Sequence, residues 1–378
     1  MNPGQTEWAR TAESPRTPWE PRVSNFEQVL LDNIPLPLKR AVLQTVLSLP
    51  RPIRRAIAGP AARIDGQEQD LDAQLLVRLM HLAGMRLFSD PIDRARIDTD
   101  EGGRLVGGVP AGPGMSIGEI TIPAGDHDIP ATLYSPADVP VGSGLLVFYH
   151  GGGWSIGSRR SHEPIARFLA AHADVRVLSI EYRLAPENPF PAAVEDAVTA
   201  FGYAHAHAAE LGADPGRIAV GGDSAGGNLA AVVAQHTAHA GGPAPAFQLL
   251  IYPATDFEAE NASRSLFATG FLLTGEDLQW GRKTYIPAGA DPANPRLSPL
   301  RGDVTGVAPA HIATAGFDPL RDEGESYAEK LAAAGVAATR RRHSSLPHGY
   351  LNFLCLRAVQ QAALDTARAL AAGLAPRT

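Results

Sequence analysis

The chain of 378 residues has a single cysteine, Cys355, and lacks any long apolar run near its N-terminus. One cysteine excludes an internal disulfide and a metal site built from several cysteines. The uncharged stretch from residue 41 to 50 is about half as long as a membrane span requires. The first 22 residues carry Glu, Arg and Pro throughout, unlike a secretory signal peptide. We therefore expect a cytoplasmic protein without a transmembrane helix.

Positive charge is also scarce. Lys and Arg together number 33 against 40 Asp and Glu, which gives a formal net charge of −7. A protein of this charge shows no sign of the basic surface that binds nucleic acid. Hydrophobic residues make up 44% of the chain, which is typical of a globular protein with a large core.

Residue patterning divides the chain into three regions. Residues 1–22 are polar and rich in proline, which predicts a disordered segment. In residues 23–110 apolar side chains recur every three or four positions, and prolines interrupt them, so short helices are expected. From residue 111 onward, β-rich runs alternate with Ala-rich helical stretches, the pattern of a mainly parallel sheet covered by helices on both faces. The expected strands are residues 117–122, 129–134, 145–149, 175–180, 218–220, 247–251, 311–314 and 338–342.

The segment Gly222-Asp223-Ser224-Ala225-Gly226 lies between an expected strand and an Ala-rich helix. A G-x-S-x-G sequence in this setting is typical of a nucleophile elbow, in which a sharp turn presents the serine at the N-terminus of a helix. Without that setting the same letters often form an ordinary Gly/Ser turn. Ser224 is therefore the predicted nucleophile.

A second glycine-rich segment, His150-Gly151-Gly152-Gly153-Trp154, follows the strand expected at 145–149. Three glycines let backbone N–H groups converge on a developing oxyanion. We predict the N–H groups of Gly151, Gly152 and Ala225 as the donors. No Lys-Ser or Lys-Thr follows the glycines, so a P-loop is excluded. His150 is assigned a structural role in this loop.

The predicted base and acid follow Ser224 along the chain, in the order expected for this kind of site. His348 follows the last expected strand, in a loop from which its ring can reach the serine. Asp318 ends the strand that begins at residue 311 and can fix the tautomer of His348. The weaker alternatives lie on a helix or in strands for the base (His236, His239, His311 and His343), and on neighbouring loops or a helix start for the acid (Asp256, Asp322 and Glu323).

The motifs HGGGW, GDSAGG, DPLRDEG and HGY occur in this order, with EYRLAPE and FPAA between the first two. Together they resemble the bacterial hormone-sensitive-lipase-like esterases from about Ile64 to the C-terminus. The resemblance implies an α/β-hydrolase fold with an eight-stranded, mainly parallel sheet. It implies a catalytic domain at 111–378 with a cap insertion at about 256–300, to which a helical region at 23–110 contributes. Its functional residues fall on Ser224, Asp318 and His348, with oxyanion donors on Gly151, Gly152 and Ala225.

The predicted reaction is hydrolysis of short- to medium-chain acyl esters through an acyl-enzyme, with no metal or cofactor. An amidase, deacetylase or arylformamidase with the same residues remains an alternative. A non-catalytic small-molecule receptor is disfavoured, because both Ser224 and His348 are present. The side chains expected to wall the pocket are Trp154, Phe271, Leu272, Leu273 and Trp280.

The resemblance says nothing about the first sixty or so residues, where arginines lie beside apolar positions. One interpretation is an amphipathic segment that docks on a membrane. The other, which we favour, is a set of extra cap helices or a contact surface for a homodimer. The arginines concerned are Arg51, Arg54, Arg55 and Arg63.

Overall fold

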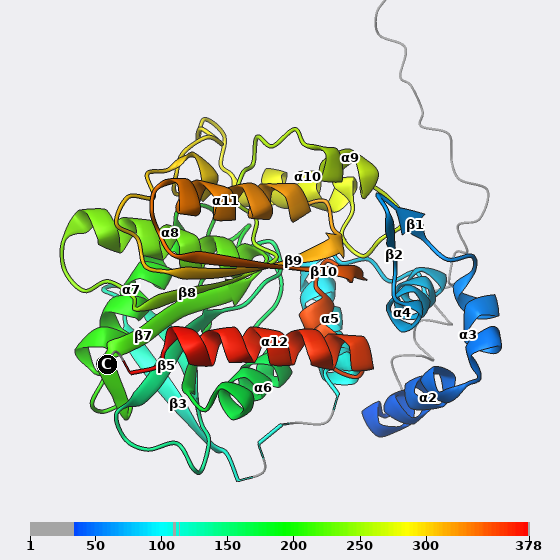
Figure 1. The fold of residues 1–378 in the computed structure, drawn as a ribbon, viewed down its shortest axis with the longest axis horizontal. Helices are drawn as coiled ribbons and strands as arrows, with labels where there is room; N and C mark the ends of the chain where they lie inside the picture. The colour runs from blue at the N-terminus through cyan, green and yellow to red at the C-terminus, as the bar shows by residue number, and fades with distance from the viewer. Residues whose placement is uncertain (1–33, 109–110, 113, 377–378) are drawn as a thin grey trace, which may run out of the picture.

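The computed structural model describes residues 34–108, 111–112 and 114–376. The segment 1–22, for which disorder was predicted, lies outside the described residues. The centre of the molecule is an eight-stranded sheet in the order β10-β9-β8-β7-β5-β6-β4-β3 (Figure 1). The two pairs at one edge, β3–β4 and β4–β6, are antiparallel, and the other five neighbouring pairs are parallel. The predicted α/β-hydrolase fold with a mainly parallel sheet is therefore confirmed.

The strands match the expected positions, and several are longer than expected. They are β3 Ser116–Pro123, β4 Asp128–Ser135, β5 Ser143–Tyr149, β6 Arg176–Ile180, β7 Ala213–Asp223, β8 Phe247–Ile251, β9 Ala310–Phe317 and β10 Ala338–Pro347. Every residue of β5, β6, β8 and β9 is buried, as expected for strands covered on both faces.

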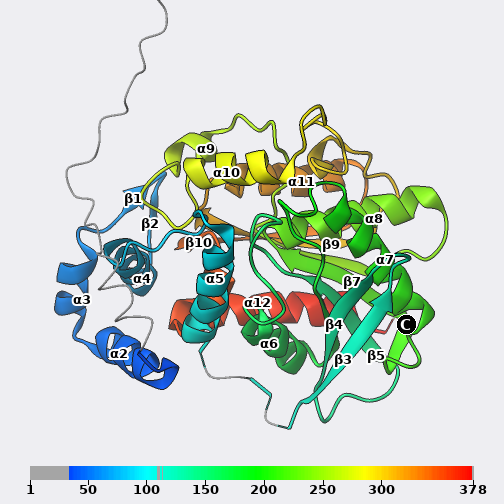
Figure 2. The same cartoon turned by 180° about the vertical axis from the view of Figure 1, so that it is seen from behind.

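Helices cover both faces of the sheet (Figures 1 and 2). Alternate residues of β5 show the two layers. Leu145, Val147 and Tyr149 belong to a buried cluster that includes residues of α7 Ala192–Ala206, α8 Ala225–Ala240 and α11 Arg321–Ala333. Leu146 and Phe148 point the other way and belong to a second cluster, which includes residues of α6 Glu163–Ala173 and α12 Arg357–Gly373.

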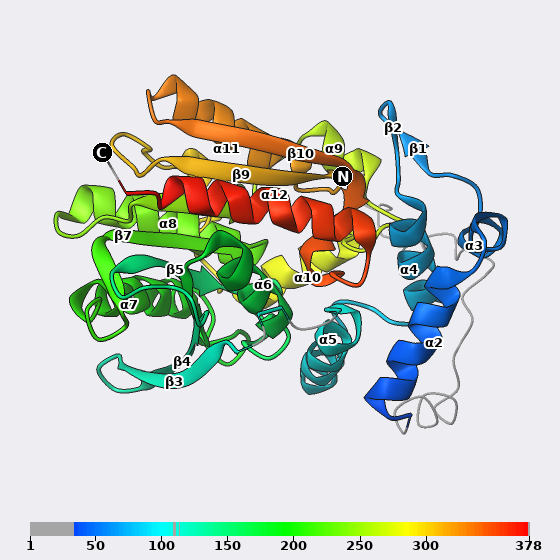
Figure 3. The same ribbon diagram turned by 60° about the horizontal axis from the view of Figure 1, so that its bottom comes forward.

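The N-terminal region forms helices, as the apolar spacing predicted. They are α2 Leu36–Ser48, α3 Arg51–Ala58, α4 Leu71–Leu82 and α5 Ile92–Val106. Between α3 and α4 lies a short hairpin, β1 Arg63–Ile64 and β2 Gln67–Glu68, which was not predicted. Figure 3 shows α2, α3 and α4 grouped at one end of the molecule, beyond the carboxyl ends of β9 and β10. Two further helices, α9 Ala262–Leu266 and α10 Gly275–Tyr285, follow β8.

Most of the N-terminal arginines are bonded within their own region. Arg54 forms an ion pair with Asp72 of α4, and Arg55 donates to the side chain of Gln74 at 2.8 Å. These contacts tie α3 to α4 and favour the interpretation of extra packing helices over that of a membrane-docking segment. Among the described residues, no helix combines the length and the apolar character needed to cross a membrane.

Candidate active site

Ser224 occupies a sharp turn between β7, which ends at Asp223, and α8, which begins at Ala225. Its backbone has φ 55° and ψ −115°, a left-handed conformation that is strained for a residue with a side chain. The flanking glycines are required by the space available. A Cβ on Gly222 would lie 2.3 Å from the carbonyl oxygen of Tyr149, and a Cβ on Gly226 would lie 1.9 Å from it. The elbow is therefore pressed against the end of β5.

The structure brings Ser224, His348 and Asp318 together at the carboxyl ends of three strands. The Nε2 atom of His348 lies 3.0 Å from Ser224 Oγ, and its Nδ1 atom lies 2.8 Å from Asp318 Oδ2. Asp318 is fully buried, and its other oxygen accepts the N–H of Leu320 at 2.8 Å. With the Nδ1 proton directed at the carboxylate, Nε2 is free to accept the serine proton. These are the residues that the motifs predicted as nucleophile, base and acid.

The alternative acids are bonded to arginines. Asp256 pairs with Arg301, with 2.8 Å between Oδ1 and Nε, and Glu323 is buried against Arg264. Asp322 accepts from Arg321. Of the alternative bases, His236 and His239 lie on α8, while His311 and His343 lie within β9 and β10, as expected. Of these candidates, His348 is hydrogen-bonded to Ser224 Oγ, and Asp318 is hydrogen-bonded to His348.

The glycine loop after β5 does not fit the prediction for Gly151. Its N–H donates to Asp223 Oδ1 at 2.8 Å, so it is not available to an oxyanion. Gly152 and Gly153 line the cavity next to Ser224 instead. Ala225 is the first residue of α8, where an N–H has no partner within the helix. The arrangement thus favours Gly152, Gly153 and Ala225 as the donors, a shift of one residue within the loop.

His150 is part of this loop's internal structure. It is fully buried, its ring stacks on Tyr182 with 4.3 Å between centroids, and its Nδ1 lies 2.8 Å from the carbonyl oxygen of Gly151. Burial lowers the pKa of His150 to about 4, so the imidazole is neutral at ordinary pH. Its surroundings agree with the structural role that the sequence suggested.

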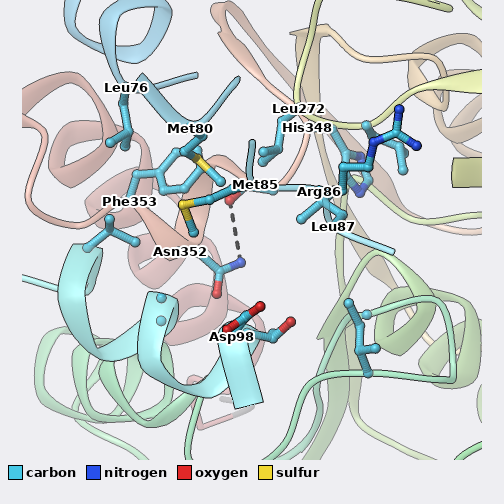
Figure 4. A pocket seen from close by; sticks show the side chains of 18 of the residues that line it. Leu76, Met80, Met85, Arg86, Leu87, Asp98, Leu272, His348, Asn352 and Phe353 are labelled. Carbon is cyan, nitrogen blue, oxygen red and sulfur yellow. Dashed lines mark hydrogen bonds between the residues drawn. The ribbon is translucent and has the colours of Figure 1, made fainter. Parts of the chain in front are cut away.

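An apolar cavity of about 340 Å³ opens over Ser224 and His348 (Figure 4). Much of its wall comes from the N-terminal helices, which were expected to contribute to a cap, and from the segment after β10, although none of the predicted wall residues lies in either part. The view in Figure 4 places His348 on one side and Leu76, Met80 and Phe353 on the other. The apolar residues that line it include Leu43, Leu76, Leu79, Met80, Leu87, Phe88, Leu105, Val106 and Phe353.

Two of the five predicted wall residues, Leu272 and Leu273, line this cavity. The others lie elsewhere. Trp154 is buried and stacks on Tyr285 with 4.5 Å between ring centroids, and Phe271 packs against two other phenylalanines in a separate cluster. Trp280 stacks behind the lining residue Phe88. An apolar residue near a motif looks the same in sequence whether it faces a cavity or the core.

Comparison with known proteins agrees with the fold. A family model described as alpha/beta hydrolase fold matches residues 146–352. The carboxylic ester hydrolase LipN of Mycobacterium tuberculosis is 47% identical over 325 residues, which span 82% of this chain and 84% of LipN. The carboxylesterase NlhH of the same species is 44% identical over 250 residues, or 65% of this chain and 77% of that protein.

Solved structures give the same result. The crystal structure of a thermostable esterase from Pseudomonas putida superposes with a TM-score of 0.78 at 33% identity, covering 84% of this chain and all of that one. A sheet of this order, with an elbow serine after β7, defines a hydrolase of the α/β class. This chain belongs to the alpha/beta hydrolase family, and its relatives fit the predicted resemblance to hormone-sensitive-lipase-like esterases.

Proposed function

We propose that this protein is a serine carboxylesterase that hydrolyses esters of short- to medium-chain acids. The observation that carries the proposal is the hydrogen-bonded series from Ser224 through His348 to Asp318, with distances of 3.0 and 2.8 Å, at the floor of an apolar cavity. The names of LipN and NlhH, both ester hydrolases, support the same activity.

In the proposed reaction, Ser224 Oγ attacks the ester carbonyl carbon while its proton passes to Nε2 of His348. Asp318 holds the imidazolium in place. The N–H groups of Gly152, Gly153 and Ala225 stabilise the negative charge on the carbonyl oxygen. The intermediate then collapses, and His348 gives the proton to the departing alcohol. A water molecule then attacks the acyl carbonyl carbon while its proton passes to His348. The bond from that carbon to Ser224 Oγ breaks, the proton returns from His348 to Oγ, and the acid is released.

The cavity supports the choice of acyl group. Its volume of about 340 Å³ is near the lower end of the range for small-molecule pockets. Its surface is largely apolar, and its leucine, methionine and phenylalanine side chains can bury a hydrocarbon chain. A short or medium acyl chain matches this space better than a long one. A cytoplasmic location and a homodimer remain predictions from the sequence.

The test is hydrolysis of p-nitrophenyl esters from acetate to palmitate by the native protein and by Ser224→Ala. We expect the rate to peak at a short or medium chain, and the substitution to abolish turnover while the melting temperature stays near that of the native protein. Full activity in Ser224→Ala would show that another residue is the nucleophile. Matched p-nitroanilides run in parallel would favour the amidase alternative if they, and not the esters, were turned over.

A further inference from the structure

A buried carboxylate lies next to the nucleophile and takes no part in the reaction proposed above. Asp223 directly precedes Ser224, and its side chain is 3% exposed. Its Oδ1 accepts the N–H of Gly151 at 2.8 Å, and the hydroxyl of Tyr252 donates to Oδ2 at 3.4 Å. Through this one side chain, the elbow after β7 is bonded to the glycine loop after β5.

His162, at the start of α6, lies next to this carboxylate. Its Nε2 lies 3.4 Å from Asp223 Oδ1, and its Nδ1 lies 2.9 Å from the hydroxyl of Ser161. The histidine is 4% exposed, and both residues line the cavity that contains Ser224. No other cation is bonded to Asp223 among the described residues.

The surroundings of Asp223 and His162 shift the pKa of each side chain toward its charged form. Burial raises the pKa of Asp223, but the positive charge of His162 and the Gly151 N–H outweigh it and hold that pKa below its ordinary value. Burial lowers the pKa of His162, but the Asp223 carboxylate outweighs this and raises it. The neighbouring His150, whose ring centroid lies 5.4 Å away, stays neutral. With 3.4 Å between His162 Nε2 and Asp223 Oδ1, the two side chains lie within ion-pair distance, although no hydrogen bond joins them.

This pairing resolves an electrostatic conflict. A carboxylate beside the elbow holds the oxyanion loop in place, because the hydrogen bond from the Gly151 N–H to a charged acceptor is strong. Without a positive partner, the same buried negative charge would destabilise the oxyanion that forms nearby during the reaction. A protonated histidine on the carboxylate cancels that charge and leaves the hydrogen bond to the loop intact.

We propose that Asp223 and His162 act as a positioning pair, in which Asp223 fixes the oxyanion loop against the elbow and His162 neutralises Asp223 beside the reacting carbonyl. Neither residue touches the reacting atoms, so both act through Gly151 and the loop. The inference rests on the proposed esterase function, because it assigns the pair to the oxyanion step of that reaction.

The test is a double-substitution cycle with His162→Gln, Asp223→Asn and both together, measured on the preferred p-nitrophenyl ester. His162→Gln leaves an uncompensated buried carboxylate, and we expect kcat to fall at least about tenfold with KM within about twofold. Adding Asp223→Asn removes the unpaired negative charge but keeps a side-chain oxygen that can accept the Gly151 N–H. The double variant should therefore recover to within about threefold of Asp223→Asn alone.

An alkyl trifluoromethyl ketone isolates the oxyanion step. Ser224 Oγ forms a bond to the ketone carbon, the proton passes to His348 Nε2, and the C=O π electrons become an alkoxide held by the oxyanion donors. No leaving group departs, so the inhibition constant reports on oxyanion stabilisation. We expect it to rise in parallel with the loss of kcat/KM across the variants. His172→Gln, at the exposed end of the same helix, is the matched control and should change neither value.

Several outcomes would overturn the inference. Losses that add up in the double variant would show that the two residues act independently and not as a pair, and single variants with native kcat would show that the pair has no role in the reaction. If His162→Gln fails to fold, Asp223→Ala against Asp223→Asn replaces it. Only alanine removes the acceptor for Gly151, so equal kcat values for these two would also contradict the proposal. A native protein that hydrolyses no ester would instead refute the proposed function.

Discussion

At the scale of single residues, the site depends on a carboxylate that is bonded through both oxygens. Asp318 accepts from His348 Nδ1 and from the backbone of Leu320, each at 2.8 Å. Asparagine in its place would fit the space but would present an N–H to the imidazole and favour the wrong tautomer. We expect Asp318→Asn to lower kcat about 10⁴-fold with little change in KM, measured on p-nitrophenyl esters.

Asp256→Asn is the control for that prediction, because Asp256 was the rival acid and is paired with Arg301 instead. It should keep kcat within a few-fold of the native value, because neither Asp256 nor Arg301 lines the cavity and the partners of His348 are Ser224 and Asp318. The assignment of the acid would be wrong if the asparagine at 256, and not the one at 318, removed activity.

The glycine loop gives a second prediction at this scale. Gly152 has φ 117°, and a Cβ there would lie 2.1 Å from the carbonyl oxygen of Ile156. We expect Gly152→Ala to displace the loop and to lower kcat by about 10²-fold or more, as the loss of an oxyanion donor does. Gly125→Ala is matched for backbone strain, since Gly125 has φ 85°, but no atom lies within 4 Å of its Cβ position. That variant should lose a little thermal stability and keep native kcat. Equal kcat in the two variants would contradict a role for the loop.

The motifs predicted which residues meet at the site, but they did not predict the hydrogen bonds of the glycine loop. Ser224, Asp318 and His348 meet as expected, because each follows a strand and parallel strands end at one edge of the sheet. The direction of a single N–H could not be predicted. Gly151 is turned away from the cavity by Asp223, a partner 72 residues further along the chain that no local pattern reveals.

At the scale of helices and strands, alternation of apolar runs with Ala-rich helices was enough to predict all eight strands of the main sheet. The start of β7 and the hairpin β1–β2 were not predicted, and each has a physical cause. β7 begins at Ala213, five residues earlier than expected, and this start contains Pro215 and Gly216, which have low strand propensity. The hairpin β1–β2 has two residues per strand, too few for alternation to show, although its Asp65-Gly66 turn is typical of tight hairpins.

The helix α2 also gives a prediction about the substrate. Leu43 of α2 lines the cavity, and Arg40 of the same helix donates to the carbonyl oxygen of Arg104 in α5, which holds the helix in place. A larger side chain at position 43 would fill the space available to an acyl chain, and a smaller one would enlarge it. We expect Leu43→Trp to shift the optimum of the p-nitrophenyl ester series to shorter chains, and Leu43→Ala to shift it to longer ones.

The size of that shift follows from hydrocarbon burial. Each methylene that fits contributes about 0.8 kcal/mol, or about fourfold in kcat/KM. Val42→Trp is the control, because Val42 is the adjacent residue of the same helix and is 57% exposed. A chain-length profile that is the same in all variants would show that α2 does not limit the acyl chain.

At the scale of the whole molecule, three histidine side chains are uncharged in the folded protein at neutral pH. Burial lowers the pKa values of His150, His311 and His343 to about 4 each. His311 and His343 lie on the adjacent strands β9 and β10, and His311 Nδ1 lies 2.8 Å from the hydroxyl of Thr339. In the unfolded chain each imidazole titrates near pH 6.5.

This difference fixes the direction of the pH dependence of stability. Between about pH 4 and 6.5 the unfolded chain binds more protons than the folded one, so the free energy of unfolding rises with pH. The stabilisation is complete above about pH 6.5 and is lost as the pH falls through about 4. We expect the melting temperature to fall steadily from pH 7 to pH 4.5, and the double substitution His311→Gln and His343→Gln to flatten that curve. His205→Gln, at a partly exposed position of α7, should leave the slope unchanged. A double variant with the native slope would mean that acid destabilises the protein through other groups.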